Sequence, residues 1–469
     1  MALPRRTFLG AAAAPFVHTG RAAARRPNVV MFMTDDHGAW ATGAYGCPTI
    51  RTPHIDRLAA GGARFTRAFA CTPVCSPSRM TYMTGALPSH HHVQDWLLPD
   101  DSYGPRSHRW LDGFRTYSEL FAGAGYTLGM CGKWHMGEDD KAQAGFTYWA
   151  TVPGGGGPYR DVAFVHDGTT RKIEGFKTDI QTDFALDFLD RHHREPFYLY
   201  VPFYAPHTPY DFQPERDRRP YAGDRFPCFP DTPMHPWQNQ GLAKMHGNTE
   251  AKRAYTALIS GVDYNVGRVV ERLEKLRVRD NTLIVFTADQ GWNAGHHGVW
   301  GKGNGTTPFN MYEESLRVPL IWNHPRRIRA GQTIDAMVSS YDYFHSILDY
   351  AGIQPPADPR HVGRSYAPFL HGHKPAWRNR LYFEYAYVRG VRTENLKYVE
   401  RTGGYPSELY DIEADPGETR NAIADPAHAA QRDGLRADLA AWFRQAGAPP
   451  LEDWRKTTTQ KLEWEARKE

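Results

Sequence analysis

This sequence of 469 residues contains no apolar run long enough to cross a bilayer, no internal repeat and no large excess of either charge. A membrane-spanning helix needs about 20 mostly apolar residues in succession. Lys and Arg number 56 and Asp and Glu 52, so the formal net charge of +4 gives no general basis for binding nucleic acid or a membrane surface. We therefore expect a soluble protein with no membrane span and no nucleic-acid partner.

Cysteine is also scarce, and its spacing does not resemble that of a zinc site. The cysteines could form a disulfide, but the sequence does not identify its partners. Glycine and proline interrupt the chain at short intervals, which is typical of a loop-rich α/β enzyme. The length allows two domains, or one large domain with an appendage. The five cysteines are Cys47, Cys71, Cys75, Cys131 and Cys228.

Residues 1–24 have the features of an export signal. The run Arg5-Arg6-Thr7-Phe8-Leu9 resembles a twin-arginine pattern, and an alanine-rich apolar run follows it. Ala22-Ala23-Ala24 would provide a cleavage site. We predict a twin-arginine signal peptide over residues 1–24, which would place the mature protein in the periplasm or outside the cell.

Four short apolar runs are each followed by polar residues. Continuous apolar runs of this length predict strands buried on both faces of a parallel sheet. In such sheets ligands bind beyond the carboxyl ends of the strands, so the polar residues are candidates for a site. The runs cover residues 27–34, 126–131, 197–203 and 283–287, and they lead to Asp35 and Asp36, Lys133 and His135, His207, and Asp289 and Gln290.

Helices are predicted between these strands. One starts at Pro53, a second starts at a capping box formed by Thr178 and Gln181, a third covers about residues 251–276, and Ser340 caps a fourth. After residue 355 the pattern changes to antiparallel strands at 381–388, 391–399 and 408–411, and then to a helix at about 426–445. We predict an α/β fold, with a mostly parallel central sheet flanked by helices in residues 25–355 and a smaller α+β subdomain in residues 356–469.

Residues 71–85 form the most informative stretch, Cys-Thr-Pro-Val-Cys-Ser-Pro-Ser-Arg-Met-Thr-Tyr-Met-Thr-Gly. Pro77 suits the first turn of a helix, and Gly85 suits its end. Cys75 and Arg79 are four residues apart and would share one helix face. The helix N-terminus would also attract an anion. A thiol, a guanidinium and an anion-binding position are therefore expected together, although a buried cysteine at the start of a core helix would give the same pattern.

This stretch resembles the signature of type I sulfatases, in which the cysteine is oxidised to formylglycine by a formylglycine-generating enzyme. Cys75, Pro77, Arg79 and Gly85 match it, as does Thr84, whereas Cys71 does not, because Cys75 stands where its arginine should be. The resemblance covers most of residues 27–352 and, more weakly, 408–421. It implies an alkaline phosphatase-like fold, and a formylglycine at position 75 whose hydrate has one hydroxyl to attack sulfur and another to expel the sulfate.

Asp35, Asp36, Asp289 and Gln290 offer oxygen ligands only, which suits calcium or magnesium better than zinc. In the family that this chain resembles, the equivalent residues bind calcium, and the metal polarises the formylglycine hydrate, so Cys75 joins the predicted metal site. Gln290 stands where the family usually has Asn or His. Helix or turn capping is the alternative role for the adjacent Asp35 and Asp36.

The resemblance also assigns catalytic roles, which we state as hypotheses. Arg79, Lys133 and Lys302 would neutralise the charged oxygens of the transition state. His207 and Lys302 are the candidates to protonate the leaving alcohol, and His135 would take a proton from the second hydroxyl to release sulfate. Among the other histidines near these motifs, only His297, within Gly-His-His-Gly, has a positional claim; the rest are His90, His91, His92 and His296.

The predicted substrate is a sulfated small molecule or glycan, cleaved in an exo fashion. Two other functions stay open: a phosphodiester or phosphonate monoester hydrolase of the same superfamily, and a non-catalytic protein that binds sulfated glycans. Aromatic rings suit sugar rings, although ordinary loop packing explains them equally well. The aromatic residues expected in rim loops are Trp96, Tyr103, Trp110, Tyr159, Tyr210 and Trp300.

Overall fold

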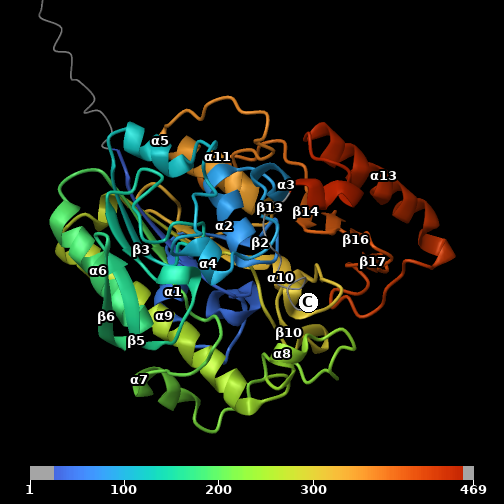
Figure 1. Ribbon diagram of the computed structural model, residues 1–469, viewed down its shortest axis with the longest axis horizontal. Helices are drawn as coiled ribbons and strands as arrows, with labels where there is room; N and C mark the ends of the chain where they lie inside the picture. Colours follow the sequence, from blue (N-terminus) through green and yellow to red (C-terminus); the bar gives the residue numbers. More distant parts are fainter. Residues whose placement is uncertain (1–25, 458–469) are drawn as a thin grey trace, which may run out of the picture.

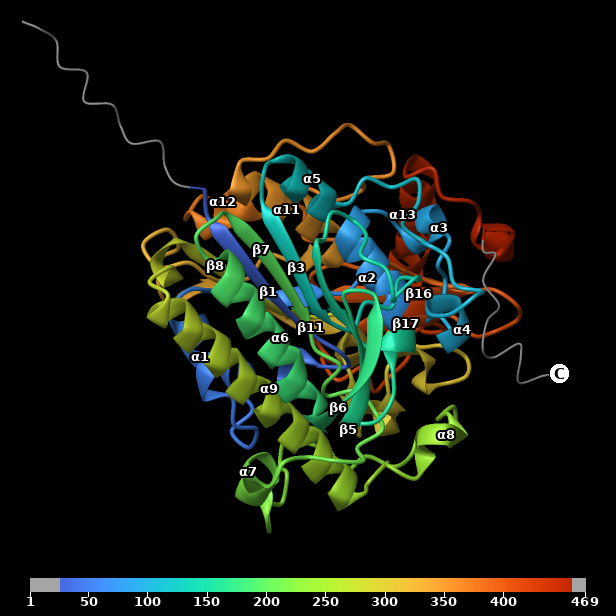
Figure 2. The ribbon, with the colours of Figure 1, turned by 60° about the vertical axis from the view of Figure 1, so that its left-hand side comes forward.

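A computed structural model describes residues 26–457, so the predicted signal peptide lies outside the described residues. The main body is a mixed, mostly parallel sheet of eleven strands with helices on both faces (Figures 1 and 2). A separate four-stranded antiparallel sheet near the C-terminus lies beside it. This confirms the predicted fold class.

The four strands predicted from apolar runs lie next to one another in the middle of the main sheet. They pair in parallel, and all but one of their residues are fully buried. The carboxyl ends of these four strands therefore lie together at one end of the sheet, as predicted. In sheet order they are β8 (Thr282–Ala288), β1 (Asn28–Thr34), β7 (Phe197–Pro202) and β3 (Thr127–Gly132).

Both edges of the sheet contain antiparallel pairs. Beyond β8, strand β11 (Arg317–Asn323) runs antiparallel to β8 and β2 (Ala63–Phe69), while β12 (Gln332–Ile334) and β13 (Val338–Ser339) pair in parallel with β2. Beyond β3, the order continues through β4 (Tyr148–Thr151) to an antiparallel pair, β5 (Arg160–His166) and β6 (Thr169–Phe176).

The side chains of the sheet alternate between two hydrophobic cores, because successive strand residues point to opposite faces. On β1, Val30 and Phe32 pack against α1 (Pro53–Ala60), α6 (Lys177–His192) and α9 (Thr249–Lys275). Met31 and Met33 face the other core, which holds α2 (Cys75–Thr84), α5 (Tyr117–Gly123) and α11 (Ser340–Ala351). Figure 2 shows these two groups of helices on opposite faces of the sheet.

The predicted helices are present, but two of the predicted caps are wrong. Helix α6 already begins at Lys177, so Thr178 lies inside it, and its hydroxyl has no hydrogen-bond partner. At α11 the N-cap is Ser339, whose N–H donates to the Asp342 carboxylate. Ser340 instead accepts a hydrogen bond from the Cys71 N–H.

The C-terminal sheet has four strands rather than the predicted three. Ala386 adopts φ 47° in the turn after residue 385, and a second turn lies at residues 393–395, so each of two predicted strands contains a turn. Helix α13 (Ala429–Gln445) covers this sheet on the outside (Figure 1). The division of the chain at residue 355 stays a prediction. The strands are β14 (Leu381–Tyr385), β15 (Val388–Arg392), β16 (Leu396–Arg401) and β17 (Glu408–Asp411).

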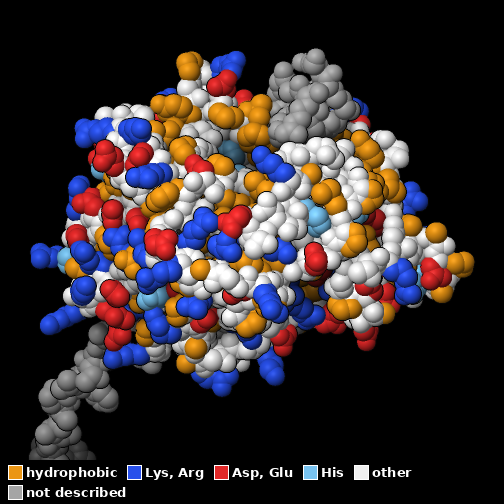
Figure 3. Space-filling model, turned by 90° about the horizontal axis from the view of Figure 1, so that it is seen from below, with side chains coloured by type: hydrophobic (Ala, Val, Ile, Leu, Met, Phe, Trp, Pro, Cys, Tyr) orange, Lys and Arg blue, Asp and Glu red, His pale blue; other side chains and the backbone are white. Residues whose placement is uncertain are grey.

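Short elements and one disulfide complete the fold. Cys47 pairs with Cys228 across 181 residues, which gives the disulfide that the sequence left unassigned. Within residues 26–457, no helix is both long and apolar enough to cross a membrane. On the face seen in Figure 3, side chains of both charges are interspersed. The short elements are α3 (Pro88–His91), α4 (Pro99–Ser102), α7 (Glu215–Arg218), α8 (Gln240–Ala243), β9 (Asn293–Ala294), β10 (Trp300–Gly301), α10 (Glu313–Leu316) and α12 (Ala367–Leu370).

Candidate active site

Cys75 is the first residue of α2, with Pro77 in its first turn as predicted. Val74 before it is extended, and Gly85 ends the helix with φ 69°, where its N–H donates to the carbonyl of Thr81. All ten residues of this helix are buried, and Cys75 is only 2% exposed. The thiol therefore sits at the helix N-terminus, inside the protein.

Side chains from the ends of four sheet strands and from the β10 hairpin surround this thiol. The Cys75 Sγ lies 3.3 Å from the Asp35 Oδ1 and 2.7 Å from the Lys302 Nζ. The Lys133 Nζ lies 2.5 Å from the Asp35 Oδ2. The carboxyl ends of β1, β3, β7 and β8 thus deliver the predicted residues to one place.

Arg79 holds the carboxylates of Asp289 and Asp35 in place. Its Nη2 and Nε donate to the Asp289 Oδ2 at 2.7 and 3.0 Å, and its Nη2 also reaches the Asp35 Oδ2 at 3.3 Å. Its Nη1 donates to the carbonyl of Lys133 at 2.8 Å. Burial would lower the pKa of Arg79, but Asp289 and Asp35 raise it above its ordinary value. The guanidinium is therefore a permanent charge held in one orientation.

Asp36 and Gln290 leave two buried oxygens without partners. Lys302 and the Gln290 Nε2 both donate to the Asp36 Oδ1 at 2.7 Å, while the Asp36 Oδ2 and the Gln290 Oε1 have no hydrogen bond. Such orphaned oxygens are costly in a protein interior. A half-turn of the Gln290 amide would direct its Oε1 toward the carboxylates, an arrangement that a cation would favour.

His207, predicted as a candidate general acid, also places a nitrogen beside these oxygens. Its Nδ1 contacts the carbonyl of Thr208, which can only accept, so Nδ1 carries the proton and Nε2 has the lone pair. That Nε2 faces the Asp36 Oδ2 at 3.6 Å. Donor atoms of Asp35, Asp36, Cys75 and His207 all lie within 4.8 Å of one another, and the site therefore fits a divalent cation.

Asp289, also predicted as a metal ligand, already accepts hydrogen bonds at both of its carboxylate oxygens. Arg79 holds its Oδ2, and its Oδ1 accepts from the Gln290 N–H at 2.9 Å. Burial, and then the neighbouring Asp35, raise the pKa of Asp289 to about 7. Burial would also raise the pKa of Asp35, but Lys133 and the other nearby cations lower it well below its usual range. The pKa values of these two neighbouring carboxylates are therefore shifted in opposite directions.

Burial and nearby charges together set the protonation of the remaining groups. Burial and the charge of Asp35 raise the pKa of Cys75 to about 12, so the thiol stays protonated at neutral pH. Burial lowers the pKa of His207 to about 4 despite Asp36. Burial would lower the pKa of Lys302 as well, but Asp36 and the other nearby acids raise it well above its usual range. Lys302 therefore stays charged while His207 is neutral.

His135 is held as a neutral imidazole with one free nitrogen. Its Nε2 lies 2.8 Å from the carbonyl of Leu97, which can only accept, so the lone pair is on Nδ1. Nδ1 is buried and has no partner. Burial and the nearby Lys133 lower the pKa of His135 well below its usual value. This side chain can accept a proton at Nδ1.

Several aromatic residues predicted to line the rim are instead buried. Tyr159 and Trp300 are fully buried and Trp110 nearly so, because they pack inside the protein beneath the loops. Trp96, Tyr103 and Tyr210 are half-buried. The expectation of a rim is therefore wrong for three of the six residues.

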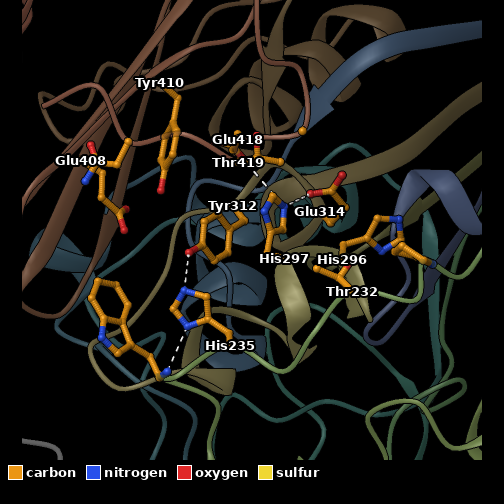
Figure 4. Close-up of a pocket in the computed structure, with 14 residues that line it drawn as sticks. Thr232, His235, His296, His297, Tyr312, Glu314, Glu408, Tyr410, Glu418 and Thr419 are labelled. Atoms are coloured by element: carbon orange, nitrogen blue, oxygen red, sulfur yellow. Dashed lines mark hydrogen bonds and ion pairs between the residues drawn. The ribbon is translucent and has the colours of Figure 1, made fainter. Parts of the chain in front are cut away.

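His297 lies in a different pocket from the residues around Cys75. This pocket of about 510 Å³ lies between the β9–β10 hairpin, α10, residues 230–237 and the C-terminal segment after β17. The His297 ring stacks on Tyr312 with 4.0 Å between centroids, and its Nε2 is 2.6 Å from the Glu314 Oε2 (Figure 4). Glu418 faces the same ring and is paired with Lys397. The charges in this pocket are therefore satisfied within the protein.

Three supporting residues were not predicted as such: Tyr204 and Lys177 were missed, and Tyr159 was expected in a rim loop instead. Tyr204 places its hydroxyl 3.1 Å from the His207 Nδ1, and Tyr159 donates from its hydroxyl to the carbonyl of His207 at 2.8 Å. Lys177 is buried beside both rings. Tyr159 and Lys177 make their contacts with segments distant in sequence, whereas Tyr204 lies three residues before His207.

The chain is similar to known proteins in both sequence and structure. The model of the family described as Sulfatase matches residues 27–353, and that described as N-sulphoglucosamine sulphohydrolase, C-terminal, matches residues 295–445. An N-acetylglucosamine-6-O-sulfatase from Bacteroides thetaiotaomicron is 28% identical, over 88% of this chain and 85% of the relative.

Solved structures are similar over nearly the whole chain. A protein in complex with its substrate D-glucosamine-2-N,6-O-disulfate superposes with a TM-score of 0.77 at 28% identity, covering 90% of this chain and 98% of that one. A phosphonate monoester hydrolase of Agrobacterium radiobacter gives 0.70 at 23% identity, with 90% and 96% coverage, which shows the fold alone.

Proposed function

Because this chain belongs to the sulfatase family and is therefore a sulfuric ester hydrolase, we propose that it removes sulfate from a saccharide, with residue 75 as the nucleophile. One observation carries this proposal: the Cys75 Sγ lies 2.7 Å from the Lys302 Nζ and 3.3 Å from Asp35 at the N-terminus of α2. Cations and a helix N-terminus around one nucleophilic position suit the attack on a sulfate ester, which carries negative charge.

We propose that Cys75 is converted to formylglycine. The pKa of about 12 keeps the thiol protonated, so the unmodified side chain would be a weak nucleophile. The hydrated aldehyde would supply one hydroxyl to attack sulfur and another to expel sulfate. The free Nδ1 of His135 is suited to accept the proton released in that second step.

A divalent cation, calcium or magnesium, would be held by Asp35, Asp36, Asp289 and Gln290 together with residue 75. The two orphaned oxygens and the clustered carboxylates support this assignment. The cation would supply positive charge to the sulfate oxygens and to the nucleophile. Arg79 orients two of these carboxylates, and Lys133 and Lys302 contribute charge directly.

The first experiment compares an aryl sulfate with an aryl phosphodiester, using protein coexpressed with a formylglycine-generating enzyme. We expect kcat/KM to be higher for the sulfate. A preference for the phosphodiester would favour a phosphodiester or phosphonate monoester hydrolase instead. A peptide mass spectrum with an unmodified thiol at residue 75, together with no turnover, would favour the non-catalytic glycan-binding function.

The proposed class of substrate, a sulfated saccharide, rests on the similar proteins and not on the site alone. A relative named for N-acetylglucosamine 6-O-sulfate, and a similar structure that binds a disulfated glucosamine, support a sulfated saccharide. We propose exo-acting removal of sulfate and a location in the periplasm or outside the cell. Incubation with defined sulfated mono- and oligosaccharides tests the first point, and activity only on internal sulfates of intact polymers would contradict it. Cell fractionation tests the second.

A further inference from the structure

Lys177 is a buried lysine for which the reaction described above has no role. It is the first residue of α6, yet its side chain points inward and is 0% exposed. Its Nζ donates to the carbonyls of Gly156 and Gly157 at 3.1 and 2.9 Å. Among the described residues, no carboxylate forms an ion pair with it. An ammonium group without a counter-ion is costly to bury, so its position needs an explanation.

The surroundings of Lys177 are aromatic and lie beside the active site. Its Nζ is 3.7 Å from the centroid of the Tyr204 ring and 5.4 Å from that of Tyr159. The Lys133 Nζ lies 5.4 Å from the centroid of the same Tyr204 ring. Aromatic faces attract a cation, most strongly where water is excluded. The ammonium is thus held by two carbonyls and two rings.

The segment that Lys177 binds is in contact with His135. Residues 153–159 contain four consecutive glycines, of which Gly154, Gly155 and Gly157 have φ of 67°, 65° and 94°. A Cβ atom at Gly155 would overlap the His135 ring. Only glycine therefore allows the segment to lie this close to the imidazole. On another side, the Leu97 carbonyl holds the His135 Nε2.

The same segment also reaches His207. At its end, Tyr159 donates from its hydroxyl to the His207 carbonyl at 2.8 Å, and the Lys177 N–H donates to the Tyr159 carbonyl at 2.7 Å. Tyr204, under the Lys177 ammonium, has its hydroxyl 3.1 Å from the His207 Nδ1. Lys177 is therefore connected to His207 through Tyr159 and, separately, through Tyr204.

We propose that Lys177 is a positioning residue that holds residues 153–159 and Tyr204 in place and thereby orients both His135 and His207. The inference deepens the proposed function and rests on it, because it concerns the two histidines of that site. Within the described residues, no hydrogen bond or ion pair joins Lys177 to Cys75. The loss of Lys177 removes the donor to the carbonyls of Gly156 and Gly157, so that residues 153–159 and Tyr204 are held less firmly beside the two imidazoles.

The test is Lys177→Met, which keeps an apolar stem of similar length but removes the donors. A misplaced His207 would slow the departure of a poor leaving group, so kcat/KM on a sugar or alkyl sulfate should fall on the order of 10- to 100-fold. The loss on nitrophenyl sulfate should be much smaller. A misplaced His135 would slow sulfate release, so a burst of nitrophenol equal to the enzyme concentration should precede slower turnover.

Two further variants keep the test decisive if Lys177→Met folds poorly. Tyr159→Phe removes only the hydroxyl bound to His207, and should reproduce the selective loss on the alkyl sulfate. Gly155→Ala pushes on the His135 ring, and should produce the burst without that selectivity. The exposed Lys172→Met is the matched control and should equal the wild type in both measurements.

Equal losses on both sulfates without a burst would overturn the positioning role and leave Lys177 a purely structural residue. Unchanged kinetics of Lys177→Met would overturn it as well. Either result requires a wild type that turns over both sulfates, so this inference can fail while the proposed function holds. A wild type with formylglycine at position 75 and no activity on any sulfate would instead refute the proposed function.

Discussion

At the scale of single residues, His207 and Lys302 compete for one role, protonation of the leaving alcohol. Lys302 stays charged because Asp36 and the other acids raise its pKa, whereas burial keeps His207 neutral in the free enzyme. A strongly held ammonium is a poor acid, and a neutral imidazole must first gain a proton. Kinetics with two kinds of leaving group can separate these possibilities.

We expect His207→Ala or Lys302→Ala to lower kcat/KM on a sugar sulfate by about 10²- to 10⁴-fold, the usual contribution of a general acid. The loss on nitrophenyl sulfate should be much smaller, because nitrophenolate leaves without protonation. The measurement is kcat/KM on both substrates for each variant. Equal losses on both substrates for both variants would reassign the two residues to sulfate binding.

The cation site gives a second prediction. Asp36→Asn should lower the calcium or magnesium content of the purified protein, because it removes the charge of the carboxylate that carries one of the two orphaned oxygens. Gln290→Asn should have a small effect, since it offers the same carbonyl with a shorter reach. Elemental analysis measures the metal directly, with the exposed Asp335→Asn as the control. Full occupancy in Asp36→Asn would remove this residue from the ligand set.

The residues of the candidate site were predictable for a physical reason. Asp35, Lys133 and Asp289 each directly follow a strand end, and the ends of parallel strands must meet. Lys177 and Tyr159 do not follow a predicted strand. The sequence alone does not distinguish a buried lysine or tyrosine from one in a surface loop. The direction of the His207 Nε2 toward Asp36 was likewise set by the Thr208 carbonyl, a contact that sequence patterns do not show.

At the scale of elements, α9 is the longest helix and forms much of one core. Its N-cap is Asn248, whose side chain accepts hydrogen bonds from the N–H groups of Glu250 and Ala251. We expect Asn248→Ala to lower the free energy of unfolding by about 1 kcal/mol, the usual cost of losing such a cap. Denaturant titration measures it, and Asn248→Asp should restore most of the loss. No change in Asn248→Ala would show that this helix end does not contribute to stability.

Strands and helices were predictable to different degrees. The central strands are buried on both faces, so their apolar runs were continuous and unambiguous. The N-caps of α6 and α11 were not, because Ser and Thr occur both at caps and just inside them. At α6, the backbone continues directly from β6, with Phe176 as the N-cap and no side-chain cap. The turn at Ala386 was hidden because apolar residues flank it on both sides.

At the scale of the whole molecule, buried histidines couple stability to pH. His324 follows β11, and burial and nearby arginines lower its pKa to about 3. An unfolded histidine titrates near pH 6.5. As pH falls from about 6.5 toward 3, the unfolded chain therefore binds a proton that the folded protein does not, and stability is lost.

We expect the free energy of unfolding of His324→Asn to depend less on pH than that of the wild type over this range. Each unit of pKa shift corresponds to about 1.4 kcal/mol, so the difference should amount to a few kcal/mol. The Asn Oδ1 can replace the ring nitrogen that contacts the Tyr350 hydroxyl. Chemical denaturation at several pH values measures the effect, and the exposed His373→Asn is the control. Parallel pH curves for wild type and His324→Asn would contradict the assignment.

The contact between β14 and the segment before α2 can form only after the ribosome has synthesised β14. The Glu384 N–H donates to the Cys71 carbonyl at 3.0 Å, and the Glu384 carboxylate accepts from the Ser89 N–H, 295 residues earlier. At about 5–20 residues per second, the ribosome needs on the order of 15 to 60 s to add these residues. Throughout that interval the nascent segment around Cys75 lacks its C-terminal cover. The modification proposed for this cysteine would therefore have a period in which to occur, and that period would end when the C-terminal sheet packs against this segment.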